Sequence, residues 1–281
     1  MYRKNLSGEM TFNSFLPMPL SDIQIVHTEQ LDSLILEVEK VICNWNAYST
    51  ELSDKQIQLL MKKEAEYSCK LALGEKPLPF GIIMKARPEL EEDTEHLFQA
   101  TSYALEATEE LPLSGRLLKN AHYLMCNSER YRKKYPGEFR NSPVWIGKEG
   151  CSLKNALFVP PVYEDMTDAF SELERYINYE KSENVFVRAA LIHYQFETIH
   201  PFIDANGRTG RLLNTLYLLE NGIIQKPVLR WSEILWRCSD RYYAELQQVH
   251  ETGVFDNWIR FFLDSLKRAA ANDDLPVINR L

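Results

Sequence analysis

This sequence lacks the features that mark several large classes of protein. Its five cysteines are scattered, and none forms a Cys-x-x-Cys pair of the kind that holds zinc or performs redox chemistry. No stretch approaches the roughly 20 apolar residues that a membrane-spanning helix needs, and the first residues do not form the apolar segment of a secretory signal. We therefore expect a reduced, cytoplasmic protein that does not associate with membranes.

The sequence also contains fewer basic than acidic residues. Lysine and arginine together number 32 against 40 aspartates and glutamates, which gives a formal net charge of −8. Because charge-driven binding to phosphate backbones needs a clustered basic excess, we do not expect a nucleic acid as partner. The 281 residues, 45% of them hydrophobic, can nevertheless bury a substantial core.

What the sequence does contain is mainly helical periodicity. Apolar residues recur at three- and four-residue spacing over 28–48, with Thr28 as the N-cap. A second helix should begin at Ser53, where a capping box is present, and end near Gly74. Further helical patterns cover 92–109, 115–127, 166–181, 185–198, 207–220, 232–249 and 255–270.

Two interruptions organise the chain. Between Phe139 and Val162, two short apolar runs, 144–147 and 156–159, flank a turn-forming segment and predict a β-hairpin. A proline-containing break near residues 77–88 separates the second helix from the third. We divide the chain there, into an N-terminal helical region (1–88) and a catalytic core with C-terminal helices (89–281).

The segment from Ile199 to Arg211, here called the signature segment, has the strongest functional content. Pro201 disfavours helical geometry at His200, so the preceding helix should end there and leave the imidazole at the mouth of a loop. The next helix should start around Asn206 and Gly207, where small residues let an anion approach the backbone amides at the positive end of the helix dipole.

The charged residues of the signature segment suit a metal-bound polyphosphate. Arg208 and Arg211 are three positions apart and can both address phosphate oxygens. Asp204 would repel a phosphate unless a cation stood between them, which makes it a Mg²⁺ candidate. His200 has an ordinary pKa near neutrality and is the candidate general base. Each residue alone has a structural explanation, but their combination in one short segment favours a functional one.

The signature segment resembles the signature of the Fic family, His-Pro-Phe-x-Asp/Glu-Gly-Asn-Gly-Arg-x-x-Arg. Ala205 replaces the usual glycine, a change that should preserve the loop if the backbone at this position is not left-handed. The resemblance extends to the lead-in helix 189–198, to 136–140, and to an N-terminal helical region over 14–73. It implies an all-α, mainly helical Fic fold with one short β-hairpin flap.

The same resemblance implies a protein adenylyltransferase. Such an enzyme transfers AMP from ATP to a Ser, Thr or Tyr hydroxyl of a protein target, which can include the chain itself, with His200 as general base. By analogy, Asp204 would hold Mg²⁺, Asn206 and Gly207 would cradle phosphates, and Arg208 and Arg211 would address the β and γ phosphates.

The predicted hairpin resembles the family's flap, which docks the target by β-augmentation along Val144, Trp145, Ile146 and Gly147. A purely structural hairpin is the alternative. A homo-oligomer is possible.

Many relatives with this N-terminal region carry an inhibitory helix whose glutamate pairs with the second signature arginine. Two segments here resemble it. In 102–107 the glutamate would be Glu106; in 61–73, which we favour, Ser68 aligns and the glutamate position falls on Ala72. This second alignment predicts that no carboxylate restrains Arg211 and that the protein is less self-inhibited than its relatives.

Two other interpretations remain at this stage. The chain could be a nucleotide-binding relative that uses another phosphate donor, removes AMP, or binds without transfer. A carboxylate-bridged metal oxidase is suggested by the Glu-x-x-His pair of Glu197 and His200. The nearest second pair, Asp93 and His96, does not match that pattern, so the oxidase is disfavoured.

Overall fold

The computed structural model describes residues 1–7, 10–77, 87–147 and 150–271, and these are mainly helical, as the sequence predicts. The elements are β1 (Tyr2–Ser7), β2 (Met10–Phe15), the 3-10 helix η1 (Leu20–Asp22), α1 (Glu29–Ser49), α2 (Asp54–Ala72), α3 (Pro88–Ala107), α4 (Gly115–Met125), the 3-10 helix η2 (Glu129–Lys134), α5 (Tyr163–Tyr179), α6 (Val185–Ile199), α7 (Asn206–Glu220), α8 (Trp231–Arg237), α9 (Ser239–Thr252) and α10 (Asp256–Ala270).

The helix starts follow the local sequence. Thr28 caps α1 by accepting a hydrogen bond from the main-chain N–H of Leu31 (3.2 Å). Ser53 and Gln56 form the predicted capping box, in which each side chain accepts from the other residue's main-chain N–H. These caps satisfy N–H groups that lack partners inside the helix, so both starts are defined locally.

The predicted single helix over 232–249 is wrong in one respect. It is broken at Cys238 (φ −121°) into α8 and α9. The two pieces have different neighbours, because α8 packs on α2 as well as on α10, whereas α9 packs on α10. Tertiary packing therefore overrides a continuous helical pattern.

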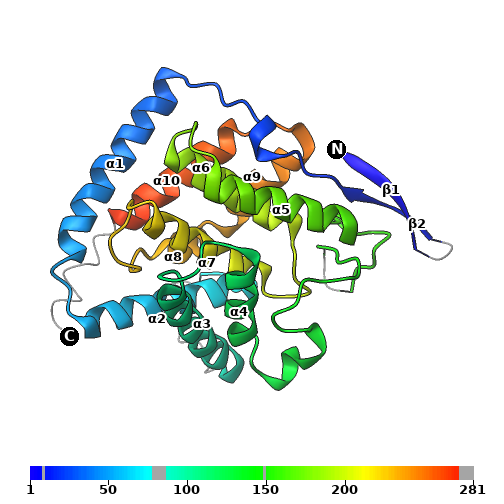
Figure 1. The fold of residues 1–281 in the computed structure, drawn as a ribbon, viewed down its shortest axis with the longest axis horizontal. Helices are drawn as coiled ribbons and strands as arrows, with labels where there is room; N and C mark the ends of the chain where they lie inside the picture. Colours follow the sequence, from blue (N-terminus) through cyan, green and yellow to red (C-terminus); the bar gives the residue numbers. More distant parts are fainter. Residues whose placement is uncertain (8–9, 78–86, 148–149, 272–281) are drawn as a thin grey trace.

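The core is built around α6. All its residues except Val185 and Glu197 are buried, so this helix is surrounded by others rather than lying on the surface. It packs against α5, α7 and α10. Figure 1 shows it among these helices, with α1 along the opposite end from the β-strands.

One continuous hydrophobic cluster includes residues from both sides of position 88, for example Val38 and Leu60 with Leu117 and Phe262. The proposed break overlaps residues 78–86, which lie outside the described part. The division into 1–88 and 89–281 therefore stays a prediction. Within the described ranges, no helix combines the length and apolar content that crossing a bilayer requires.

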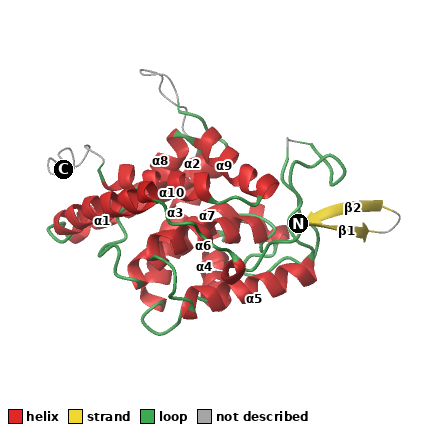
Figure 2. Cartoon of the chain, turned by 90° about the horizontal axis from the view of Figure 1, so that it is seen from above, coloured by secondary structure: helices red, strands yellow, loops and turns green. Residues whose placement is uncertain are grey.

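The sheet lies where the sequence did not predict it. β1 and β2 form an antiparallel pair in which Tyr2 is opposite Phe15, and this hairpin projects from one end of the helical body (Figure 2). The predicted hairpin at 144–159 is reduced to one isolated bridge between Ile146 and Phe158, with residues 148–149 outside the described part. Its last residue, Val159, instead accepts a hydrogen bond from the N–H of Phe15 (2.8 Å).

Candidate active site

His200 stands at the end of α6, where the sequence predicted it. Its backbone is left-handed (φ 51°), and its N–H donates to Phe196 O (3.0 Å). The ring Nδ1 lies 3.1 Å from the carbonyl oxygen of Glu197, so Nδ1 carries the proton and donates it to this oxygen. Burial lowers the pKa of His200 to about 4. The ring is therefore neutral near pH 7, with the Nε2 lone pair unprotonated.

Arg140 secures the main chain at His200, a role that the sequence did not reveal. Its guanidinium donates to His200 O (2.7 Å), Ile199 O (3.1 Å) and Pro161 O (2.6 Å), and more weakly to Ser142 O (3.3 Å). The side chain is fully buried. It satisfies carbonyls at the C-terminus of α6, where a positive charge is favourable, and it ties this end to the segment that follows the predicted flap.

His122, on α4, is a second positioning residue that the sequence analysis missed. Its ring stacks on Phe202 with centroids 3.9 Å apart. Nδ1 accepts from the N–H of Gly137 (2.9 Å), which leaves Nε2 to donate to the carbonyl of Asp204 (3.1 Å). Burial lowers the pKa of His122 to about 4, so this neutral tautomer holds the middle of the signature segment.

The side chain of Asn206 stabilises the loop through hydrogen bonds to the main chain of Phe202. Its Oδ1 accepts from Phe202 N (2.8 Å) and its Nδ2 donates to Phe202 O (2.9 Å). The amide side chain is therefore occupied, and only the main-chain N–H of Asn206 remains for a phosphate. Within the described ranges, no acceptor is recorded for the N–H groups of residues 206–208 at the start of α7. Such a turn can bind an anion.

Alanine is expected to preserve the loop only if the backbone at position 205 is not left-handed, and this condition is not met. The φ of Ala205 is 60°, in the left-handed region. An L-residue with a Cβ is held there at a cost of about 1–2 kcal/mol. The loop keeps the conformation that the family's glycine would adopt freely, because Asn206 and His122 hold the residues on both sides.

Asp204 is already paired with protein cations. Oδ2 accepts from the ammonium of Lys134 in η2, and Oδ1 accepts from the N–H of Ala205 (2.5 Å) and lies 3.8 Å from Arg208. Burial alone would raise the pKa of Asp204, but the hydrogen bond and charge of Lys134 outweigh it and the net shift is downward. The carboxylate is therefore ionised and about one third exposed.

Arg208 faces α3 and η2. It donates to Tyr131 Oη (2.8 Å) and lies 3.2 Å from the carboxylate of Asp93, which also accepts from Arg130 and Tyr131. Only 3% of the Arg208 side chain is exposed. Its Nε and Nη1 have no hydrogen-bond partner within the described ranges, and of the two only Nη1 lies near the Asp93 carboxylate.

Arg211 faces a different helix. Its Nε donates to Ser68 Oγ and its Nη2 to Ser68 O, both at 2.8 Å, so α2 holds this arginine. Ala72 is exposed at the last residue of α2, one turn beyond Ser68, and Glu106 is exposed on α3. The structure thus brings Ser68 to Arg211. Arg211 is therefore restrained by Ser68, even though position 72 offers no carboxylate.

The surroundings of Arg211 are tightly packed. A cavity of about 20 Å³ between α2, α3 and α7, lined by both Arg208 and Arg211, has room for about one water molecule. Glu197 of α6 is also close enough to Arg211 to be affected by its charge. Burial raises the pKa of Glu197 to about 7, although the charge of Arg211 acts against this shift. A Cβ at Gly210 would lie 2.5 Å from Glu197 Oε1. This glycine therefore permits the close approach of α6 and α7.

The predicted docking segment lies at the surface. Trp145 and Ile146 are 43% and 42% exposed, Gly147 is exposed and Val144 is half-buried. The Ile146 N–H donates to Phe158 O (2.8 Å). Its role in target docking stays a prediction.

The oxidase alternative gains no support from the geometry. Within the described ranges, no three His, Cys, Asp or Glu side chains gather as metal ligands would. Asp93, from the suggested second pair, is instead bound to arginines and a tyrosine.

Known proteins match this chain in sequence. Residues 112–218 match the model of the Fic/DOC family. The protein adenylyltransferase Fic of Drosophila yakuba is 34% identical over 147 residues, which are 50% of this chain and 26% of that protein. The Drosophila melanogaster protein of the same name is 33% identical over 50% of this chain and 27% of its own length. The match thus spans about a quarter of these relatives.

Solved structures match over more of the chain. A Fic family protein from Desulfovibrio desulfuricans G20 is 19% identical, with a TM-score of 0.69 over 90% of this chain and 76% of that one. Fic-1 (residues 134–508) from C. elegans is 17% identical, with a TM-score of 0.56 over 90% of this chain and 74% of that one. The fold is therefore the mainly helical Fic fold. Within it, residues 112–218 are the part that matches the Fic/DOC family model.

Proposed function

We propose that this protein is an adenylyltransferase that moves AMP from ATP to a Ser, Thr or Tyr hydroxyl of a protein target, which can include the chain itself. The observation that carries the proposal is the fixed tautomer of His200. Nδ1–H is held by the carbonyl of Glu197, so Nε2 is the atom that can accept a proton. The curated relatives named protein adenylyltransferase support the same reaction class.

In the proposed step, the target hydroxyl oxygen attacks the α-phosphorus of ATP and its proton passes to Nε2 of His200. The bond from the α-phosphorus to the bridging oxygen breaks, and pyrophosphate leaves with that electron pair. His200 then returns the proton to solvent. Phosphoryl chemistry of this kind depends chiefly on positioning and charge stabilisation. The unpaired N–H groups at the start of α7 supply donors for this purpose.

The residues present fit a Mg²⁺ ion held by one carboxylate, with nucleotide phosphates and water as its remaining ligands. Asp204 is ionised and about one third exposed, which suits such a ligand. The ion would neutralise phosphate charge. Lys134 now pairs with the same carboxylate, so it would have to leave Asp204 when a metal binds.

The two arginines would need to change partners to reach a nucleotide. Arg211 is bound by Ser68 and Arg208 by Asp93 and Tyr131, with little free volume between them. We propose that the described conformation is a resting state in which α2 restrains Arg211. A protein that binds nucleotide without transfer is the second candidate. It is favoured because the N–H groups at the start of α7 are available to a phosphate while both arginines are held by protein partners.

A labelling experiment separates these candidates. Purified protein is incubated with Mg²⁺ and ATP labelled at either the α or the γ phosphate, alone and with cell lysate. AMP transfer predicts protein-bound label from the α position and none from the γ position. The label should disappear in His200→Ala and persist in His27→Ala, a matched change at an exposed histidine outside the site.

The other outcomes have definite meanings. Label from the γ position would show phosphate transfer and contradict the proposal. Nucleotide binding by calorimetry with no His200-dependent label on any protein would favour binding without transfer. Parallel reactions with the other α-labelled nucleoside triphosphates test the donor. Loss of label from a pre-modified protein in the absence of ATP would indicate AMP removal.

A further inference from the structure

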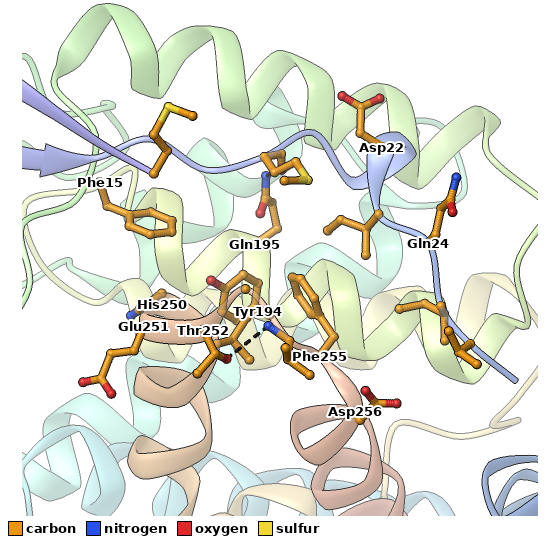
Figure 3. Close-up of a pocket in the computed structure, with 18 of the residues that line it drawn as sticks. Phe15, Asp22, Gln24, Tyr194, Gln195, His250, Glu251, Thr252, Phe255 and Asp256 are labelled. Atoms are coloured by element: carbon orange, nitrogen blue, oxygen red, sulfur yellow. Dashed lines mark hydrogen bonds between the residues drawn. The ribbon is translucent and has the colours of Figure 1, made fainter. Parts of the chain in front are cut away.

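A separate cavity of about 600 Å³ lies away from the signature segment (Figure 3). Its size falls in the range of about 300–1,000 Å³ that is typical of ligand sites. None of residues 200–211 lines it. It is lined by residues 22–26, by the α6 residues Tyr194 and Gln195, and by residues 249–256, which run from the end of α9 to the start of α10. Met1, Tyr2, Phe15 and Met18 complete the lining.

The cavity combines an apolar interior with an acidic margin. Ile23, Ile25 and Phe255 are half-buried among its lining residues. Three exposed carboxylates, those of Asp22, Glu251 and Asp256, surround it, as Figure 3 shows. No lysine or arginine side chain is among the residues that line it, so the amino group of Met1 is outnumbered by three carboxylates and the lining remains acidic. A complementary ligand therefore carries both apolar groups and positive charge.

One wall has the properties of an unpaired strand. Side chains alternate along it, with Ile23 and Ile25 half-buried and Gln24 and Val26 exposed, the two-residue period of extended backbone. Within the described ranges, no hydrogen bond is recorded for the main-chain groups of residues 24–26. An extended peptide can pair with such an edge and place alternate side chains in the cavity.

We propose that this cavity binds an extended peptide segment of a partner protein, in which apolar side chains alternate with lysine or arginine. One end of the cavity leads toward the predicted flap. Phe15 and His250 lie at this end, and the His250 ring stacks on Phe158 with centroids 4.1 Å apart. The inference concerns binding alone and does not depend on the proposed transfer of AMP.

Defined peptides test the proposal on the whole chain without nucleotide. Fluorescence anisotropy at low ionic strength compares a labelled eight-residue peptide of alternating valine and lysine with two controls, one alternating valine with glutamate and one alternating glycine with lysine. The valine–lysine peptide should bind saturably and at least tenfold more tightly than either control. N-methylation of alternate peptide nitrogens should weaken its binding at least fivefold, because it blocks strand pairing.

Charge neutralisation locates the site. The triple variant Asp22→Asn, Glu251→Gln, Asp256→Asn should bind the valine–lysine peptide about tenfold more weakly, since each exposed ion pair contributes about a two- to fivefold effect. All three side chains are exposed, so folding should be unaffected.

A matched triple variant controls for net charge. Glu39→Gln, Glu109→Gln, Glu110→Gln removes the same charge from exposed positions that do not line the cavity, and it should bind like the unchanged protein. Absence of saturable binding would overturn the proposal, as would equal weakening by both triple variants or equal binding of the glycine–lysine peptide. Concentration-dependent dimerisation that only the first triple variant abolishes would identify a second copy as occupant and also overturn it.

Discussion

Replacing Arg140 by methionine should destabilise the protein strongly and displace His200, the proposed general base. The change keeps an unbranched apolar stem of similar length but removes every donor of the guanidinium. Arg140 donates to four carbonyls, two of which belong to the last turn of α6 and to His200 itself. The carbonyls of Ile199 and Pro161, which lie in buried residues, would lose this partner.

The magnitude follows from two opposing contributions. A hydrogen bond from a charged donor is worth about 1.5–3 kcal/mol, so the three shorter contacts together could exceed about 5 kcal/mol. Removing the cation also removes its desolvation cost, which is several kcal/mol for a buried charge. That cost is substantial here, because burial lowers the pKa of Arg140 to about 10. We expect a net loss of about 3–5 kcal/mol in the free energy of unfolding, near the upper end for single substitutions.

Urea denaturation followed by tryptophan fluorescence measures this loss. Arg140→Lys should have an intermediate effect, because one ammonium cannot reach all the carbonyls that a planar guanidinium serves. Arg132→Met is the matched control at an exposed arginine and should change stability by less than about 0.5 kcal/mol. An unfolding free energy of Arg140→Met within 1 kcal/mol of the unchanged protein would refute the reasoning.

Three further predictions concern the signature segment and α2. NMR titration of the His200 ring should give a midpoint near pH 4. Because the ring of the unfolded chain takes up its proton near pH 6.5, the free energy of unfolding should decrease as the pH falls from about 6.5 to about 4. A midpoint above 6 would contradict the burial argument. Lys134→Met should raise the affinity for Mn²⁺, measured by electron paramagnetic resonance, about two- to fivefold, because it frees Asp204 from an ion pair. Lys134→Arg should leave this affinity unchanged. An unchanged affinity of Lys134→Met would rule out competition between Lys134 and the metal. Ala72→Glu should lower His200-dependent self-labelling at least fivefold, because it adds a carboxylate one turn beyond Ser68, the residue that binds Arg211. Ala72→Gln is the control. Equal labelling rates for the two variants would refute the alignment that places the inhibitory glutamate at position 72.

Several elements could be predicted from the sequence because their causes are local. The start of α2 depends on a capping box between Ser53 and Gln56, and the end of α6 coincides with the residue before Pro201. The β1–β2 hairpin was missed because its strands lack a clear alternation of apolar and polar residues, and Phe15 is stabilised by packing on Phe158 and His250 from distant segments.

The candidate site likewise has a part that could be predicted from the sequence and a part that could not. The signature segment, with His200 followed by Asp204 and the arginines of α7, could be read directly because its residues are close in sequence. The partners of these residues could not, since Arg140 lies 60 positions from His200 and Ser68 lies 143 from Arg211. No local pattern marks such pairs, because they meet only when helices pack.

The sequence by itself thus determined a helical Fic domain and the chemical groups of its candidate site, because caps, periodicity and a contiguous signature act over a few residues. Only the tertiary structure decided the state of those groups. Packing α6 against its neighbours makes His200 neutral, α2 holds Arg211, and Lys134 pairs with Asp204. Burial and ion pairing depend on which distant side chains share a low-dielectric space, and this depends on how the whole chain folds.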